Sequence, residues 1–155
     1  MNKASYDKAR DSLMAKDYNA AKREFIDALN SIDEHHEFYN KVTSYLGLAQ
    51  VLTSDRNGLL LCRDAASSGV LEGDVYLNLA CAEWHANNRR RAVEAINHGR
   101  EIDDSHQQLV RASILIDSRR RSMLPFLSRE HFLNRLLGRM MRKNRGQLTV
   151  HMLLS

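Results

Sequence analysis

The chain has 155 residues, of which 43% are hydrophobic and 27% charged, a composition that suits one compact domain or a short repeat array. A single proline and seven glycines are too few for the many turns of an all-β protein, so the composition favours an all-α fold. The net charge of +4 is uneven: residues 1–118 hold 14 Lys and Arg against 18 Asp and Glu, whereas residues 119–146 hold nine basic residues against Glu130 alone.

The sequence also bears on the compartment. No apolar run follows Lys3, and no stretch approaches the roughly 18 consecutive apolar residues of a membrane span. Cys62 and Cys81 both lie in apolar helical patterns, which indicates buried thiols rather than a disulfide or a metal pair. These features predict a cytoplasmic protein.

Residues 2–35 predict a first pair of helices joined by a turn at Lys16, Asp17 and Tyr18. Within the second helix of this pair, Ala21, Phe25 and Ala28 follow one another at intervals of four and three, so they share one face. Small residues on such a face permit close approach of the partner helix.

Residues 40–72 predict a degenerate second pair. Its first helix contains Leu46 and Gly47, and its turn spans residues 54–57. In its second helix Leu59 and Arg63 occupy the places where the first pair has a small and a large apolar residue.

Residues 73–106 predict the clearest pair, with a first helix over 74–86, a turn at Asn87 and Asn88, and a second helix over 89–102. Ala92, Ile96 and Gly99 repeat the intervals of four and three seen in the first pair without a gap.

The 34-residue period and the placement of small residues resemble the tetratricopeptide repeat family. The matching residues are Ala9, Tyr18, Ala21, Phe25 and Ala28 in the first unit, and Tyr76, Leu79, Ala80, Ala92, Ile96 and Gly99 in the third. Departures from the family pattern are Ser5, Lys8 and Ser12 in place of large residues, and Asp33 and Asp104 in place of a proline. The resemblance implies an all-α superhelix of antiparallel helix pairs that binds another protein.

Residues 107–122 predict a helix that covers the last pair, and a basic amphipathic helix is expected over 129–142. The chain thus divides into a repeat array with its capping helix, residues 2–118, and a basic extension, residues 119–155. The basic residues of the expected extension helix are Arg129, Arg135, Arg139, Arg142 and Lys143. This helix is interpreted in three ways: docked on the array, bound to nucleic acid or an anionic membrane, or self-associating through an apolar stripe that contains Phe132.

No catalytic or cofactor motif is present, including the glycine-rich phosphate loops and the zinc protease signature. Cys81 and His85 stand at i and i+4, which suits a metal, but no carboxylate lies close to this pair. The sequence therefore predicts a non-enzymatic protein without cofactor, metal or small-molecule substrate.

In the family that the chain resembles, the first helices of successive repeats line a concave groove. The residues that map onto this groove are Tyr6, Arg10, Leu13, Met14, Lys41, Ser44, Leu48, Val51, Leu52, Asp74, Leu77, Cys81, Trp84 and His85. The mapped surface is largely apolar, which suits an amphipathic helix or an extended segment of a partner protein. Core packing explains Leu48, Leu52 and Leu77 equally well, whereas Trp84 is expected to be half-exposed.

Some members of that family grip a carboxylate with a lysine and asparagines in the groove. The corresponding positions here hold Tyr6, Arg10, Tyr45, Asp74 and Asn78, so that clamp is expected to be absent. The expected function is that of an adaptor or small chaperone that binds another protein. A homo-oligomer is also possible, and nucleic acid or a membrane surface is a less favoured partner.

Overall fold

A computed structural model describes residues 3–69 and 71–120, and in this part of the chain all regular secondary structure is helical. The helices are α1 (Lys3–Met14), α2 (Tyr18–Asn30), α3 (Tyr39–Leu52), α4 (Asn57–Ser67), α5 (Gly73–His85), α6 (Arg89–Ile102) and α7 (Gln107–Arg120). The predicted all-α fold is confirmed. None of the described helices has the length and apolar character needed to cross a bilayer.

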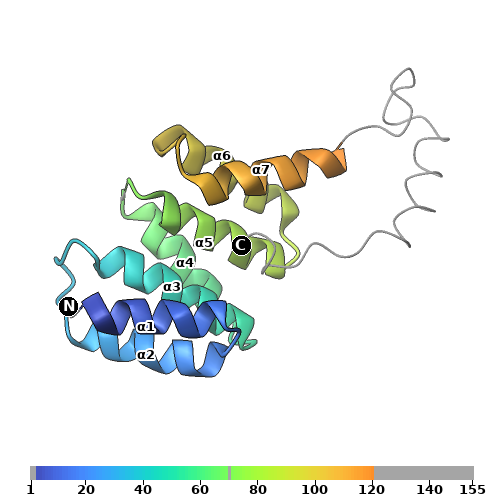
Figure 1. The fold of residues 1–155 in the computed structure, drawn as a ribbon. Helices are drawn as coiled ribbons and strands as arrows, with labels where there is room; N and C mark the ends of the chain where they lie inside the picture. The colour runs from blue at the N-terminus through green and yellow to red at the C-terminus, as the bar shows by residue number, and fades with distance from the viewer. Residues whose placement is uncertain (1–2, 70, 121–155) are drawn as a thin grey trace, which may run out of the picture.

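The helices form three successive pairs, α1 with α2, α3 with α4 and α5 with α6, and the pairs stack in chain order (Figure 1). Each second helix also packs against the first helix of the next pair, and α7 packs against α6. The first helices α1, α3, α5 and α7 contact one another in that order. They make one layer of the molecule, which we call the first-helix face.

The turns inside the three pairs share one backbone conformation. In each turn one residue adopts a positive φ between 64° and 67°, and the next residue donates its N–H to a carbonyl five positions earlier. The positive-φ residues are Lys16, Ser54 and Asn87, and the bonds join Asp17 to Ser12, Asp55 to Gln50 and Asn88 to Glu83 at 2.8–3.0 Å. This is the left-handed helix terminus of the Schellman type. The three pairs therefore share the same turn geometry.

The second pair departs from the sequence prediction by one residue. The buried series of α4 is Gly58, Cys62 and Ala65, rather than the predicted positions 59, 63 and 66. The stretch between Ser54 and the buried series is one residue shorter than in the other two turns, so every position of α4 is shifted by one. With this correction all three second helices carry small or apolar residues at intervals of four and three.

Glycines set the distance between α3 and α4. A Cβ added to Gly47 would meet the Gly58 carbonyl oxygen at 2.7 Å, and one added to Gly58 would overlap the Gly47 carbonyl oxygen. The two backbones therefore touch at a point where no side chain fits, which is the close approach that small residues allow.

The core runs continuously between the two layers of helices. Its largest fully buried side chains include Leu13, Phe25, Leu48, Leu77 and Ile96. At the end of the array, Leu109, Ala112 and Ile116 of α7 join the same core. A Cβ on Gly99 would meet Tyr76 at 2.8 Å and Leu109 at 2.9 Å, so this glycine lets α7 close over the last pair. The basic extension predicted from position 119 lies almost wholly outside the described residues.

A candidate binding site on the first-helix face

The apolar groove predicted from the sequence is largely absent from this face. Five of its predicted residues belong to the hydrophobic core, with exposed fractions of 7% or less: Leu13, Leu48, Val51, Leu77 and Cys81. The prediction is wrong for these residues because α3 and α5 have neighbours on most sides. All positions from 42 to 49 of α3 are buried, so no single face of that helix is free.

The other predicted groove residues differ in exposure. Tyr6 and Ser44 are also buried, at 8% and 0%, so the prediction of an open groove is wrong for them as well. Arg10 and His85 are exposed, whereas Met14, Leu52 and Trp84 are half-buried, as expected for Trp84. The guanidinium of Arg89 lies 5.5 Å from the centre of the Trp84 ring, a cation–π contact.

A group of polar side chains crosses α1, α3 and α5 and reaches the start of α7. We call this group the polar cluster; its members are Tyr6, Arg10, Lys41, Ser44, Tyr45, Asp74, Asn78 and His106. Helical spacing explains its geometry, because residues three or four apart lie on one face. Lys41 and Ser44 of α3 thus stand opposite Asp74 and Asn78 of α5.

The first link of the polar cluster is ionic. The Nζ atom of Lys41 lies 2.7 Å from Oδ2 of Asp74 and 3.2 Å from Oε2 of Glu72. The other Asp74 oxygen lies 3.0 Å from Nε2 of His106. Burial alone would raise the pKa of Asp74, but the Lys41 and His106 contacts outweigh it and lower that pKa. Asp74 is therefore held as a carboxylate.

His106 ties this link to α7. Its Nδ1 accepts the N–H of Leu109 at 3.3 Å, which assigns the ring proton to Nε2, the atom that faces Asp74. A Cβ on Gly73 would meet His106 Cδ2 at 2.5 Å, so the first residue of α5 must be glycine for the imidazole to sit there.

The second link leaves one acceptor unpaired. The Ser44 hydroxyl donates to the Lys41 carbonyl at 2.7 Å, so its oxygen accepts from Asn78 Nδ2, 3.0 Å away. This assignment fixes the orientation of the Asn78 amide. Its Oδ1 is then buried without a hydrogen-bond partner in the described part of the chain.

The aromatic part of the polar cluster leaves a second atom unpaired. The Tyr6 and Tyr45 rings meet edge to face with centroids 5.8 Å apart. The Tyr6 hydroxyl lies near Tyr45 and Arg10, yet it meets no group within the described residues in full hydrogen-bond geometry. Burial raises the pKa of both tyrosines, which keeps the two hydroxyls neutral.

Most members of the polar cluster stand at groove or clamp positions that the sequence analysis named. His106, and Glu72 as the second ion-pair partner of Lys41, were not predicted from the sequence. The space left by Gly73 signals the place of His106, but only the packing of α7 on α5 brings the two together.

The thiols of Cys62 and Cys81 are free and buried, as predicted, and burial raises the pKa of both. Within residues 3–69 and 71–120 no three His, Cys, Asp or Glu side chains are placed to hold a metal ion.

No protein-family model, no curated protein and no solved structure matches the chain.

Proposed function

We propose that this chain is a non-enzymatic interaction module, an adaptor or small chaperone, that binds a segment of another protein on the first-helix face. The observation that carries this proposal is the exposed guanidinium of Arg10, which lies beside the Tyr6 hydroxyl and takes part in none of the ion pairs found among the described residues. The Tyr6 hydroxyl itself is buried there without a full hydrogen bond. Buried polar groups in folded proteins almost always have a partner, and a polypeptide brings both N–H and C=O groups to supply one.

The charges around these atoms define the kind of segment. Lys41 is already paired with Asp74 and Glu72, so the remaining cation of the cluster is the exposed Arg10. Asn78 is fully buried, so the accessible contact of the cluster is at Arg10, and the segment that fits is polar with an acceptor for this guanidinium. Such a polar segment differs from the segment with aliphatic anchor residues that the predicted apolar groove would bind.

We also infer that the helix pairs are tetratricopeptide-type repeats. Support comes from the recurrent left-handed turn and from the buried series at intervals of four and three in all three second helices. Members of that family bind partner proteins on the layer of first helices, which agrees with the position of the polar cluster.

Selection of peptides from a random library on the full chain, followed by affinity measurement with the variants Tyr6→Phe and Arg10→Gln, tests the proposal. We expect each variant to weaken the selected peptides roughly fivefold, the effect of about 1 kcal/mol for one hydrogen bond. Because the Tyr6 hydroxyl makes no full hydrogen bond within the described residues, Tyr6→Phe should keep or raise the free energy of unfolding.

Matched controls are Tyr18→Phe and Arg23→Gln, which make the same chemical changes on α2. Equal effects of the control and test variants on peptide affinity, or a library that yields no peptide at all, would refute binding at the polar cluster.

A further inference from the structure

A second concavity lies on the opposite layer, between α4 and α6, with α5 as its floor. It is a cleft of about 560 Å³, within the range of known ligand sites. Its lining residues are Arg63, Tyr76, Leu79, Glu83, Arg91, Glu94, Ala95 and His98. None of these belongs to the polar cluster, so the cleft is independent of the function proposed above.

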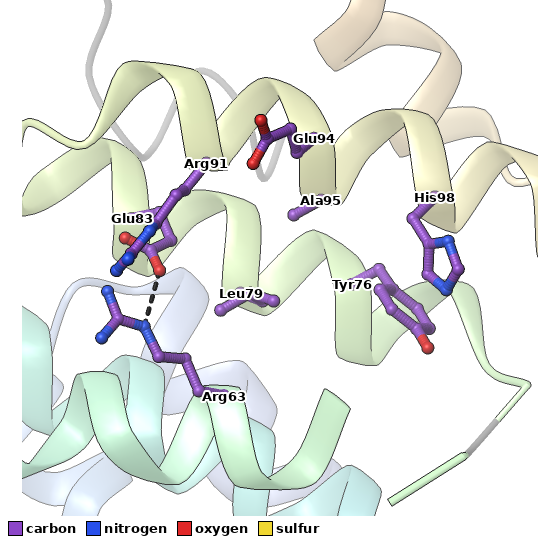
Figure 2. Close-up of a pocket in the computed structure, with 8 residues that line it drawn as sticks. All are labelled: Arg63, Tyr76, Leu79, Glu83, Arg91, Glu94, Ala95 and His98. Atoms are coloured by element: carbon purple, nitrogen blue, oxygen red, sulfur yellow. Dashed lines mark hydrogen bonds and ion pairs between the residues drawn. The ribbon is translucent and has the colours of Figure 1, made fainter. Parts of the chain in front are cut away.

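The charges at one end of the cleft are unbalanced. Figure 2 shows Arg63 of α4 and Arg91 of α6 extending toward Glu83 from opposite walls. Each oxygen of the buried Glu83 carboxylate already accepts one hydrogen bond, one from Arg63 Nε at 2.8 Å and the other from Asn88 Nδ2 at 2.7 Å. The outward-facing Glu94 is already paired with Arg90.

Two sets of donors therefore remain at this end. The hydrogen bond to Glu83 uses only Nε of Arg63, which leaves its two Nη groups. Arg91 is exposed and takes part in none of the ion pairs found among the described residues. Guanidinium groups bind carboxylates through such paired N–H donors.

The rest of the cleft is apolar and rigid. Its floor is formed by Tyr76 and Leu79, with Ala95 on the wall (Figure 2). Tyr76 is fixed by a hydrogen bond of 3.3 Å from its hydroxyl to the Ala66 carbonyl and by an edge contact with the His98 ring at 4.9 Å.

The geometry points to a second docking site in this cleft for an acidic peptide segment, with one carboxylate between Arg63 and Arg91 and an aliphatic side chain over Tyr76 and Leu79. Charge complementarity favours this occupant over a basic or neutral one, because two arginines at this end face the single carboxylate of Glu83, while Glu94 is paired with Arg90.

The test uses the full chain and a fluorescein-labelled peptide of alternating glutamate and leucine at about 150 mM salt, where long-range attraction is screened. Arg91→Gln should weaken binding roughly fivefold, the effect of one partly desolvated ion pair. Its matched control is Arg23→Gln, which removes the same charge from an exposed position of α2 that does not line the cleft. We expect less than a twofold change for the control.

Amide shifts in a ¹⁵N-labelled chain locate the binding. Peptide-induced shifts should centre on residues 76–83 and 94–98, and at a subsaturating peptide concentration they should shrink in Arg91→Gln in proportion to its lower occupancy. This readout separates the cleft from the basic extension, which also attracts acidic peptides. Equal losses for Arg23→Gln and Arg91→Gln, equal binding of a lysine–leucine peptide, or shifts confined to other residues would overturn the proposal.

Discussion

At the residue scale, the contact between Gly47 and Gly58 makes a prediction with an unusual sign. In an exposed helix, replacing glycine by alanine stabilises by up to about 1 kcal/mol. Gly58→Ala should instead lower the free energy of unfolding by about 1–3 kcal/mol, because the new methyl group would overlap the Gly47 carbonyl oxygen and force α3 and α4 apart. Urea denaturation followed by circular dichroism measures the change.

The control for this variant is Asn57→Ala, one position earlier on the exposed side of α4. It should change the free energy of unfolding by no more than about 0.5 kcal/mol. A stabilising effect of Gly58→Ala would show that the two backbones are not in contact.

Asp74 gives a prediction about pH. Its folded-state pKa is lowered, so its ion pair with Lys41 and its hydrogen bond from His106 stabilise the fold above the unfolded pKa of about 3.9 and are lost as pH falls through the folded pKa. Asp74→Asn should therefore cost about 1–2 kcal/mol at pH 7, and the difference from the wild type should close below about pH 4. Denaturation at pH 7, 5 and 3 measures this difference. Asp104→Asn, at an exposed position, is the control, and a pH-independent gap would contradict the ionic role.

At the element scale, the three left-handed turns make the ends of α1, α3 and α5 equivalent. Two of them place Lys16 and Ser54 at a positive φ, which a residue with a Cβ adopts at a cost. Lys16→Gly should relieve that cost and raise the free energy of unfolding by about 0.5–1 kcal/mol. Thermal unfolding of Lys16→Gly against Lys8→Gly, where the glycine falls inside α1 and should destabilise by about 1 kcal/mol, checks the sign. Destabilisation by both variants would rule out strain at Lys16.

The same helices show which structural features the sequence pattern predicts correctly and which it does not. The boundaries of α5 and α6 follow from the third unit because its small and large residues keep their spacing and Asn87 and Asn88 mark the turn. In α4 the spacing is equally regular, but a turn one residue shorter shifts its register, and counting from the start of the unit assigns Leu59 where Gly58 belongs.

The candidate site was harder to predict than the helices for a physical reason. A helical face is read from spacing, but whether it is open depends on which helices pack around it. Leu48 and Leu77 occupy positions that face a groove by spacing, yet the neighbours of α3 and α5 bury them. The hydrogen bond between Ser44 and Asn78 joins residues that are 34 positions apart in the sequence. A pattern within a single helix cannot predict a contact between residues so far apart.

At the scale of the whole molecule, the distribution of charge distinguishes protein binding by the repeat array from nucleic-acid or membrane binding by the basic extension. Residues 3–118 of the array carry more acidic than basic side chains, whereas the extension holds the excess of positive charge. A site on the first-helix face should hold its peptide through local hydrogen bonds that salt affects little. Binding through the extension should weaken steeply with salt, since each phosphate contact releases counterions.

Replacing Arg129, Arg135, Arg139, Arg142 and Lys143 by glutamine in the full chain tests this separation, because it turns the net charge of +4 into −1 without shortening the protein. Affinity for a single-stranded oligonucleotide should fall at least tenfold and lose most of its salt dependence, since the slope of affinity against salt follows the number of neutralised phosphates. Affinity for peptides selected on the first-helix face should stay within twofold, because their contacts around Arg10 are unchanged. The matched control replaces the five exposed basic residues Lys16, Arg23, Arg56, Arg90 and Arg91 of the array by glutamine, an equal change in net charge. If this control lowers oligonucleotide affinity as much as the extension variant, net charge alone governs the attraction. If the extension variant abolishes peptide binding, the extension rather than the polar cluster holds the partner.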